Sequence, residues 1–283
     1  MGDDEPIIDA HVHVWRRPHL DAASLWQRPY LVESLLQTLD DAGVTAAIQV
    51  TPSPEGYDNT YGTEVAGAHP DRVRIFGRFD PTADDPNGRL QAWMGSPGAA
   101  GIRLTAFGRS AALAGRLDAL DPFWEACERL AVPVAVFAPD ELTALLAVIE
   151  RRPQLCLIVD HLGLGVYPGC RDPLAGLKVL PEFAAFPQVR VKISGLPEVS
   201  HEGFPFPDVH EHLAGALELF GADRLIWGSN HPVVLQWCTY AESLTYLEAC
   251  EFLSASDRHW LLSGTVEQLL NMPREGVRQQ APD

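Results

Sequence analysis

The 283-residue sequence is 46% hydrophobic and 21% charged, a composition typical of a globular protein with a sizeable core. Its formal net charge of -17 argues against nucleic acid or an anionic membrane surface as a partner. No apolar run is long enough to cross a membrane, and the acidic N-terminus, which leads directly into a predicted strand, lacks the pattern of a signal peptide.

Short β-branched runs alternate with longer helical patterns along the whole chain. The predicted strands cover residues 7–13, 44–50, 73–79, 101–104, 132–137, 155–161, 189–194 and 224–229. Between them, apolar residues recur at helical spacing, for example over residues 31–42, 118–131, 141–151 and 207–220. Eight strands with intervening helices are the count of a (β/α)8 TIM barrel, which is the fold that we predict.

An open, doubly wound sheet is the alternative arrangement for such a pattern. It is disfavoured because no Gly-rich phosphate-binding loop follows the first strand. The Pro- and Gly-rich stretches at 51–56, 163–170 and 195–207 are short enough to be loops at one mouth of a barrel. No low-complexity linker or internal repeat divides the chain, so residues 1–283 are expected to form a single barrel domain.

The first predicted strand carries polar residues at every second position of PIIDAHVHVW, residues 6–15. Because alternate side chains of a strand share a face, Asp9, His11 and His13 are predicted to point into the barrel, and the apolar residues between them to pack under the helices. His11 and His13 then stand at the C-terminal end of the strand, where barrel active sites lie. Two imidazoles there can bind a metal or polarise a carbonyl group, whereas burying them for stability alone would cost free energy.

Further candidates end other predicted strands. His161 ends LCLIVDHLG and is predicted to face the barrel interior, with Asp160 on the opposite face and bonded outward to a loop or to backbone. Arg103 ends the fourth strand and Arg78 the third, and a guanidinium group suits a substrate carboxylate, although either could equally form a salt bridge at the rim. Lys192 of VKISGL either reaches the interior or lies among the helices.

The five cysteines are odd in number, widely spaced and without a CxxC pair. They are therefore interpreted as reduced thiols, and the protein as cytoplasmic. The histidines away from the strand ends are expected to be structural or solvated, and they are His19, His69, His201, His210, His212 and His259.

Four segments, in the order IIDAHVHVW, VDHLG, VKISGL and RLIWGSNHPV, resemble the amidohydrolase superfamily. The most similar branch is the amidohydrolase-2 group, which holds sugar-lactone and pyrone-dicarboxylate lactonases and related decarboxylases. The resemblance spans nearly the whole chain and implies a distorted (β/α)8 barrel with its site at the strand C-termini. It also implies that His11, His13 and His161 are metal ligands or, in metal-free members, groups that polarise the substrate.

The chain departs from this family in its last strand. There the family carries an Asp, in a GSDWP-like motif, that bonds the hydrolytic water and acts as general base, but this sequence reads GSNHP, with Asn230 and His231. A carboxamide cannot take a proton from water and is a poorer metal ligand than a carboxylate. The fifth strand, PVAVFAP, also lacks the histidine of a decarboxylase-type site. We therefore expect no metal, or only weakly bound zinc or manganese, whose ligands would be His11, His13 and His161.

Three functions are compatible with these residues. The favoured one is hydrolysis of a small anionic or cyclic ester (lactone) substrate, with His231 or another histidine as base and Arg78, Arg103 and Lys192 as substrate-binding residues. The second is a lyase, isomerase or cyclase reaction, such as decarboxylation, dehydration or cyclisation. The third is a catalytically inactive barrel that binds a ligand, against which the intact histidines argue. The expected partner is a small molecule, neither nucleic acid nor a membrane, and the sequence leaves open whether the chain forms a homo-oligomer.

Overall fold

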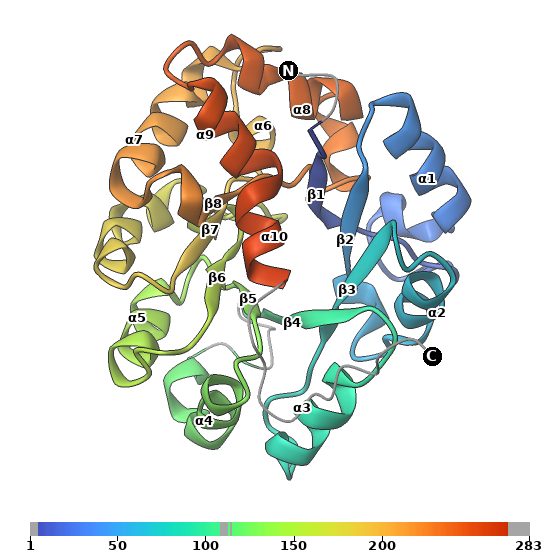
Figure 1. Ribbon diagram of the computed structural model, residues 1–283, viewed down its shortest axis with the longest axis vertical. Coiled ribbons are helices and arrows are strands. Elements are labelled where there is room, and N and C mark those ends of the chain that lie inside the picture. The colour runs from blue at the N-terminus through green and yellow to red at the C-terminus, as the bar shows by residue number, and fades with distance from the viewer. Residues whose placement is uncertain (1–4, 108–112, 114, 271–283) are drawn as a thin grey trace.

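Eight parallel strands follow one another around a nearly closed barrel in the order of the sequence (Figure 1). The computed structural model describes residues 5–107, 113 and 115–270. The strands are β1 Ile8–Val12, β2 Ala46–Val50, β3 Val73–Arg78, β4 Ala99–Thr105, β5 Val134–Phe137, β6 Leu157–Val159, β7 Arg190–Lys192 and β8 Leu225–Ile226. The segment after β8 returns to β1, where the Ala10 amide donates to the Trp227 carbonyl at 3.2 Å and the His13 amide to the His231 carbonyl at 2.8 Å. The predicted (β/α)8 barrel is confirmed.

All eight predicted strands are present, and several are shorter than the sequence indicated. The last strand ends at Ile226 rather than at residue 229, because the amide of Trp227 donates to the carbonyl of Leu261 at 2.8 Å instead of to a neighbouring strand. The sixth strand ends at Val159 rather than at residue 161, where the chain enters a tight turn.

Helices surround the barrel on its outside, and the last of them lies across one end of it (Figure 1). They are α1 Val32–Asp41, α2 Thr60–Ala68, α3 Pro86–Met94, α4 Asp121–Arg129, α5 Leu142–Arg151, α6 Leu196–Val199, α7 His210–Phe220, α8 Tyr240–Ala249, α9 Ala255–His259 and α10 Thr265–Leu270. The four predicted helices correspond to α1, α4, α5 and α7, which end within a few residues of the expected positions. Helix α1 shows why the pattern works, because Val32, Leu35 and Leu39 share one face and are buried against the barrel. None of the helices in the described part of the chain is long and apolar enough to cross a membrane.

Two apolar layers hold the barrel together. The outer layer lies between strands and helices, and the inner layer fills the lumen with Ile8, Ile48, Phe76, Ile158 and their neighbours. Helix α10 closes the lumen at the end where the strands begin, because its Val266 and Leu269 pack into the inner layer. Each such side chain contributes about 1.5–3 kcal/mol on burial. The lumen is therefore filled at that end, which leaves the other end for a functional site.

The first strand does not alternate regularly, and Asp9 therefore lies on a different face from His11 and His13. The register of β1 against β2 shifts within the strand. Ile8 and Ala10 lie in the inner layer, while the Asp9 carboxylate points the other way and accepts a hydrogen bond from the Tyr240 hydroxyl of α8 at 3.0 Å. The His11 amide donates to Asp9 Oδ1 at 3.0 Å, which stabilises the irregular turn of the strand. The prediction that Asp9 shares the inward face with the histidines is therefore wrong.

Candidate active site

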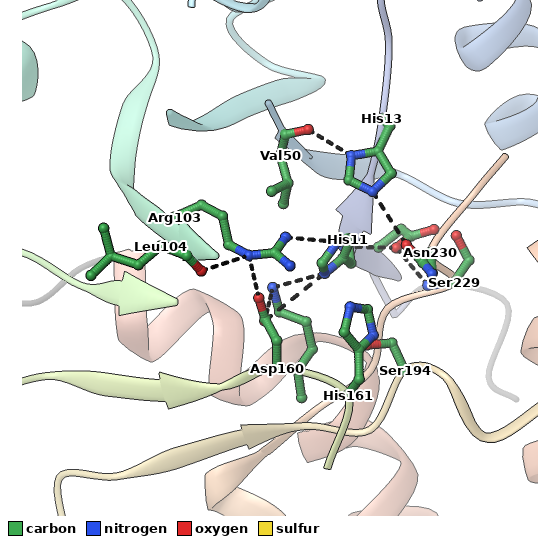
Figure 2. Close-up of polar contacts among 12 residues, drawn as sticks. His11, His13, Val50, Arg103, Leu104, Asp160, His161, Ser194, Ser229 and Asn230 are labelled. Carbon is green, nitrogen blue, oxygen red and sulfur yellow. Dashed lines mark hydrogen bonds and ion pairs between the residues drawn. The ribbon is translucent and has the colours of Figure 1, made fainter. Parts of the chain in front are cut away.

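Polar side chains from four strands converge where the strands of the barrel end (Figure 2). His11 comes from β1, and His13 directly follows that strand. Arg103 comes from β4 and Lys192 from β7, and His161 follows β6. The ring centroid of His11 lies 5.0 Å from that of His13 and 4.7 Å from that of His161. All five residues are buried, with no more than 6% of their surface exposed. We call His11, His13 and His161 the histidine cluster.

The turn after β6 brings two polar residues into the site rather than one. Leu157 and Val159 pack into the outer layer, and Ile158 lies in the inner layer. Asp160 continues the phase of Ile158 and therefore points inward, so the prediction that Asp160 faces outward is wrong. His161 reaches the site because its φ of 55° turns the backbone out of the extended conformation, which is uncommon for a residue other than glycine.

Asp160 is held between two cations inside the barrel. Lys192 Nζ lies 2.9 Å from its Oδ1, and Arg103 Nε lies 3.1 Å from its Oδ2. Burial alone would raise the pKa of the Asp160 carboxyl, but Lys192 and Arg103 more than offset that effect and lower the pKa to about 2. Lys192 therefore lies in the interior, the first of its two predicted positions, and Asp160 is a permanent anion at neutral pH.

His11 stands between the same two cations. Lys192 Nζ lies 3.3 Å from His11 Nδ1, and Arg103 Nη1 lies 3.4 Å from His11 Nε2. Burial first, and then the charge of Lys192, hold the pKa of His11 well below its usual range. A neutral imidazole has only one lone pair, so His11 can accept a hydrogen bond from one of these two donors at a time. The other donor is available to a substrate.

His13, Asn230 and Glu198 form a chain of contacts at the edge of the histidine cluster. The Nδ1 atom of His13 lies 2.7 Å from the carbonyl oxygen of Val50, and its Nε2 lies 3.2 Å from Asn230 Oδ1. Asn230 Nδ2 donates to Glu198 Oε1 at 2.6 Å. Burial lowers the pKa of His13 to about 4 and raises that of Glu198 to about 7. The predicted site residue Asn230 thus contacts the cluster and links it to a carboxylate.

His161 is fixed by one hydrogen bond and one aromatic contact. Ser194 Oγ lies 2.8 Å from His161 Nδ1, and the ring of Phe137 meets the imidazole edge to face at a centroid distance of 5.1 Å. Burial lowers the pKa of His161 to about 3, so this histidine is neutral at physiological pH. Its Nε2 makes no hydrogen bond within the part of the chain that the structure describes and is thus available to a ligand.

Arg78 lies beside the site and contacts hydroxyl groups instead of a carboxylate. Its Nη1 donates to Thr105 Oγ1 at 2.7 Å and to Ser53 Oγ at 3.1 Å. Its guanidinium carbon lies 5.9 Å from the centre of the Tyr57 ring. Burial and the neighbouring Arg103 lower the pKa of Arg78 to about 10, which still leaves it charged at neutral pH.

His231 is oriented away from the histidine cluster. Its Nε2 lies 2.6 Å from the Tyr30 hydroxyl, and its ring meets that of Tyr240 edge to face at 5.0 Å. The φ of 61° at Asn230 turns the chain between the two residues, so that Asn230 faces His13. His231 faces Tyr30 and Tyr240 of α8. A catalytic role for His231 stays a prediction.

Sequence reasoning missed the position of Asp160 and the presence of Glu198. The phase of Ile158 was a usable signal for Asp160, since residues two apart on a strand share a face. Glu198 follows the seventh strand by several residues and lies in the short helix α6, between Pro197 and Val199. Nothing in the pattern SGLPEV distinguishes it from an exposed helical glutamate.

The residues of the site do not fit a tightly bound divalent metal. The ammonium group of Lys192 and the guanidinium group of Arg103 approach the two ring nitrogens of His11, which is the central member of the cluster. Two cationic side chains at this distance would repel a dication strongly in a buried site. Asp160, whose Oδ1 lies 3.9 Å from Nδ1 of His11, is already paired with both of them.

Comparison with known proteins places this geometry in a family. A family model described as amidohydrolase matches residues 8–272, and the chain therefore belongs to the amidohydrolase family. It is similar to an L-fucono-1,5-lactonase of Burkholderia ambifaria, with 28% identity over 97% of this chain and 98% of that protein. It is also similar to a 4-sulfomuconolactone hydrolase of Rhizobium radiobacter, with 27% identity over 79% of this chain and 75% of that protein.

The likeness extends to solved structures. An amidohydrolase of Burkholderia multivorans with bound zinc is 25% identical and superimposes with a TM-score of 0.79 over 95% of this chain and 100% of that one. The predicted superfamily is thus confirmed, and with it the prediction that the chain is a hydrolase of the amidohydrolase type.

Proposed function

We propose that this protein hydrolyses a small anionic lactone at the histidine cluster. The observation that carries the proposal is the burial of two cations, Arg103 and Lys192, against His11 at the carboxyl ends of the barrel strands. The lactonase and lactone hydrolase names of its relatives support a cyclic ester as the substrate. A non-hydrolytic lyase or isomerase, or an inactive binding barrel, has no comparable support.

The charges of the site favour an anion. Arg103, Lys192 and Arg78 carry positive charge, and Asp160 neutralises only part of it. An incoming carboxylate or the oxyanion of a hydrolytic intermediate would pair with the remaining positive charge in a site that excludes much of the water. The protein as a whole is negatively charged, so it does not attract an anion from a distance. The positive charges of the site therefore favour an anionic substrate only once it is close to them.

The histidines are proposed to act as neutral hydrogen-bonding groups. Their pKa values lie at or below about 4 for His13 and His161, so none is protonated at pH 7. His11, Arg103 and Lys192 would polarise the lactone carbonyl and stabilise the negative charge that develops on its oxygen. A reaction of this kind uses fixed protein charges where other hydrolases use a metal ion, and we propose that any zinc or manganese is weakly held.

A panel of lactones tests the proposal. L-Fucono-1,5-lactone and 4-sulfomuconolactone are incubated with the purified protein, and loss of lactone is followed by chromatography against the spontaneous rate. We expect turnover of at least one, with the anionic lactone favoured, and loss of activity in His11→Ala. A protein that hydrolyses neither lactone, or a His11→Ala variant with full activity, would contradict the proposed function.

Three broader predictions accompany the proposal. A cytoplasmic location is supported by the five cysteines, all of which are free thiols. We also propose that residues 1–283 form one barrel domain and that the protein needs no macromolecular partner for its reaction. Gel filtration would decide whether it assembles with itself.

A further inference from the structure

Three carboxylates in the described part of the chain contact the strand-end residues of the site. Two of them are fully engaged in hydrogen bonds or ion pairs with the protein. Asp9 accepts hydrogen bonds from the amides of His11 and Ser229 and from the Tyr240 hydroxyl. Asp160 is neutralised by its two cations. Asp9 therefore holds the backbone, and Asp160 is too weak a base to take a proton from water.

Glu198 is placed differently. It is half-buried in α6, and its Oε1 accepts a single hydrogen bond, from Asn230 Nδ2 at 2.6 Å. No lysine or arginine of the described residues forms an ion pair with it, and its Oε2 accepts no hydrogen bond from them. The titratable group that faces it from the next segment is the Cys238 thiol, whose pKa is raised to about 12 by burial and by nearby glutamates, so that it stays neutral.

We propose that Glu198 is the general base of this enzyme and takes the proton from the hydrolytic water, in the role that a last-strand Asp fills elsewhere in the family. This inference rests on the proposed lactone hydrolysis. The carboxylate is supplied from α6, after β7, and Asn230 on the last strand positions it at the edge of the histidine cluster.

The pKa of Glu198 is consistent with a role as general base, because burial raises it. Burial brings the pKa of Glu198 to about 7, whereas the histidines nearby have a pKa of about 4 or lower. A general base is most effective when its pKa lies near the working pH. Glu198 meets this condition, and His13 and His161 do not.

Asn230 can form a hydrogen bond with Glu198 in both of its protonation states. With Nδ2 toward Glu198, the amide donates to the carboxylate form, and its Oδ1 then faces the unprotonated Nε2 of His13 without a hydrogen bond. After Glu198 gains a proton, a half-turn of the amide would present Oδ1 to the new carboxylic acid and Nδ2 to His13. The Nε2 of neutral His13 has a lone pair for that bond, because its Nδ1 donates to the Val50 carbonyl. An Asp at this position would instead repel the ionised Glu198.

The proton and electron balance of the step is simple. As the water oxygen attacks the lactone carbonyl carbon, one water proton moves to the Glu198 carboxylate and the carbonyl π electrons move to the carbonyl oxygen. When the tetrahedral intermediate collapses, those electrons re-form the carbonyl group and the ring C–O bond breaks. The departing ring oxygen takes the proton from Glu198, which returns to its carboxylate form and leaves the ring-opened hydroxy acid.

The test compares Glu198→Gln with Glu202→Gln, a matched change at an exposed glutamate four residues along the chain. The probe is whichever of L-fucono-1,5-lactone and 4-sulfomuconolactone the wild-type protein hydrolyses faster, and kcat/KM is measured from pH 5.5 to 9. We expect the wild-type value to rise with pH around a midpoint near 7. Glu198→Gln should lose about 10²-fold or more and lose this rise, since removing a general base has effects of this size. Glu202→Gln should match the wild type.

A second variant separates chemistry from folding. Glu198→Asp keeps a carboxylate and should retain the rise with pH at a reduced kcat. The inference is overturned if Glu198→Gln stays within threefold of the wild type, if its residual activity keeps the same pH dependence, or if Glu198→Asp is as inactive as Glu198→Gln. A wild-type protein that hydrolyses neither lactone refutes the proposed function itself, and the role of Glu198 with it.

Discussion

Replacing Asn230 by Asp sets a second carboxyl group against Glu198. The two side chains are 2.6 Å apart at their closest atoms, so their charge centres would lie about 4 Å apart, where two like charges repel by roughly 4 kcal/mol at an effective dielectric constant of about 20. Glu198 is partly exposed, and the pair can share a proton in a hydrogen bond, which reduces this figure. We therefore expect the apparent pKa of the pair to rise by at least about one, or about 1.4 kcal/mol.

The assay is kcat/KM for lactone hydrolysis as a function of pH. Because the base must be ionised to act, the rise near pH 7 should move to pH 8 or above in Asn230→Asp, and activity at pH 7 should fall about tenfold. Activity at pH 9 should return to within a few-fold of the wild type. Gln236→Glu is the control, because it adds the same charge at an exposed position on the same segment.

The opposite result would refute the reasoning. If Asn230→Asp were more active than the wild type at pH 7, or if its rise with pH moved to lower values, the new carboxylate would itself be acting as the base. Glu198 would then have no catalytic part, and the Asn at position 230 would be a loss of function rather than a change in the source of the base.

Other variants probe the remaining parts of the site. His11→Ala and His161→Ala should each lower kcat by on the order of 10²-fold while the melting temperature changes little, whereas an unchanged kcat would remove the cluster from the mechanism. Asp160→Asn leaves the charges of Lys192 and Arg103 buried without their anion. The free energy of unfolding, measured by thermal denaturation, should fall by about 3–5 kcal/mol. Folding raises the pKa of Glu198 from 4.5 to about 7, so the wild-type protein loses stability as the pH rises through this range. Glu198→Gln removes this effect, and its free energy of unfolding should exceed that of the wild type by about 2 kcal/mol at pH 8–9 and equal it at pH 4. Equal unfolding curves at pH 8.5 would argue against a buried, perturbed glutamate.

Most of the fold could be predicted because its pattern repeats. Eight β-branched runs separated by amphipathic stretches define the barrel, and the parallel pairing follows from the helices between them. The strand ends could not be placed as well, since they depend on tertiary hydrogen bonds. Trp227, for instance, donates to Leu261, far along the chain, and β8 ends before it.

The site was predictable where residues follow regular alternation and not where the backbone leaves it. His11 and His13 stand where the sequence indicated, but Asp9 points outward, and the register shift that follows it in β1 separates its face from theirs. The left-handed turn at His161 lets two consecutive residues, Asp160 and His161, reach the same site, which an alternating strand does not allow. A local backbone conformation of this kind depends on tertiary packing, which cannot be inferred from the neighbouring sequence alone.

The central claim is that fixed protein charges and a protein carboxylate replace a metal ion in lactone hydrolysis. The most direct measurement is kcat/KM of the chelator-treated wild-type protein on the same lactones, with its zinc and manganese content determined by elemental analysis of the same sample. We predict undiminished hydrolysis with well under one equivalent of metal. Activity that disappears on chelation and returns in proportion to added zinc or manganese would contradict the account.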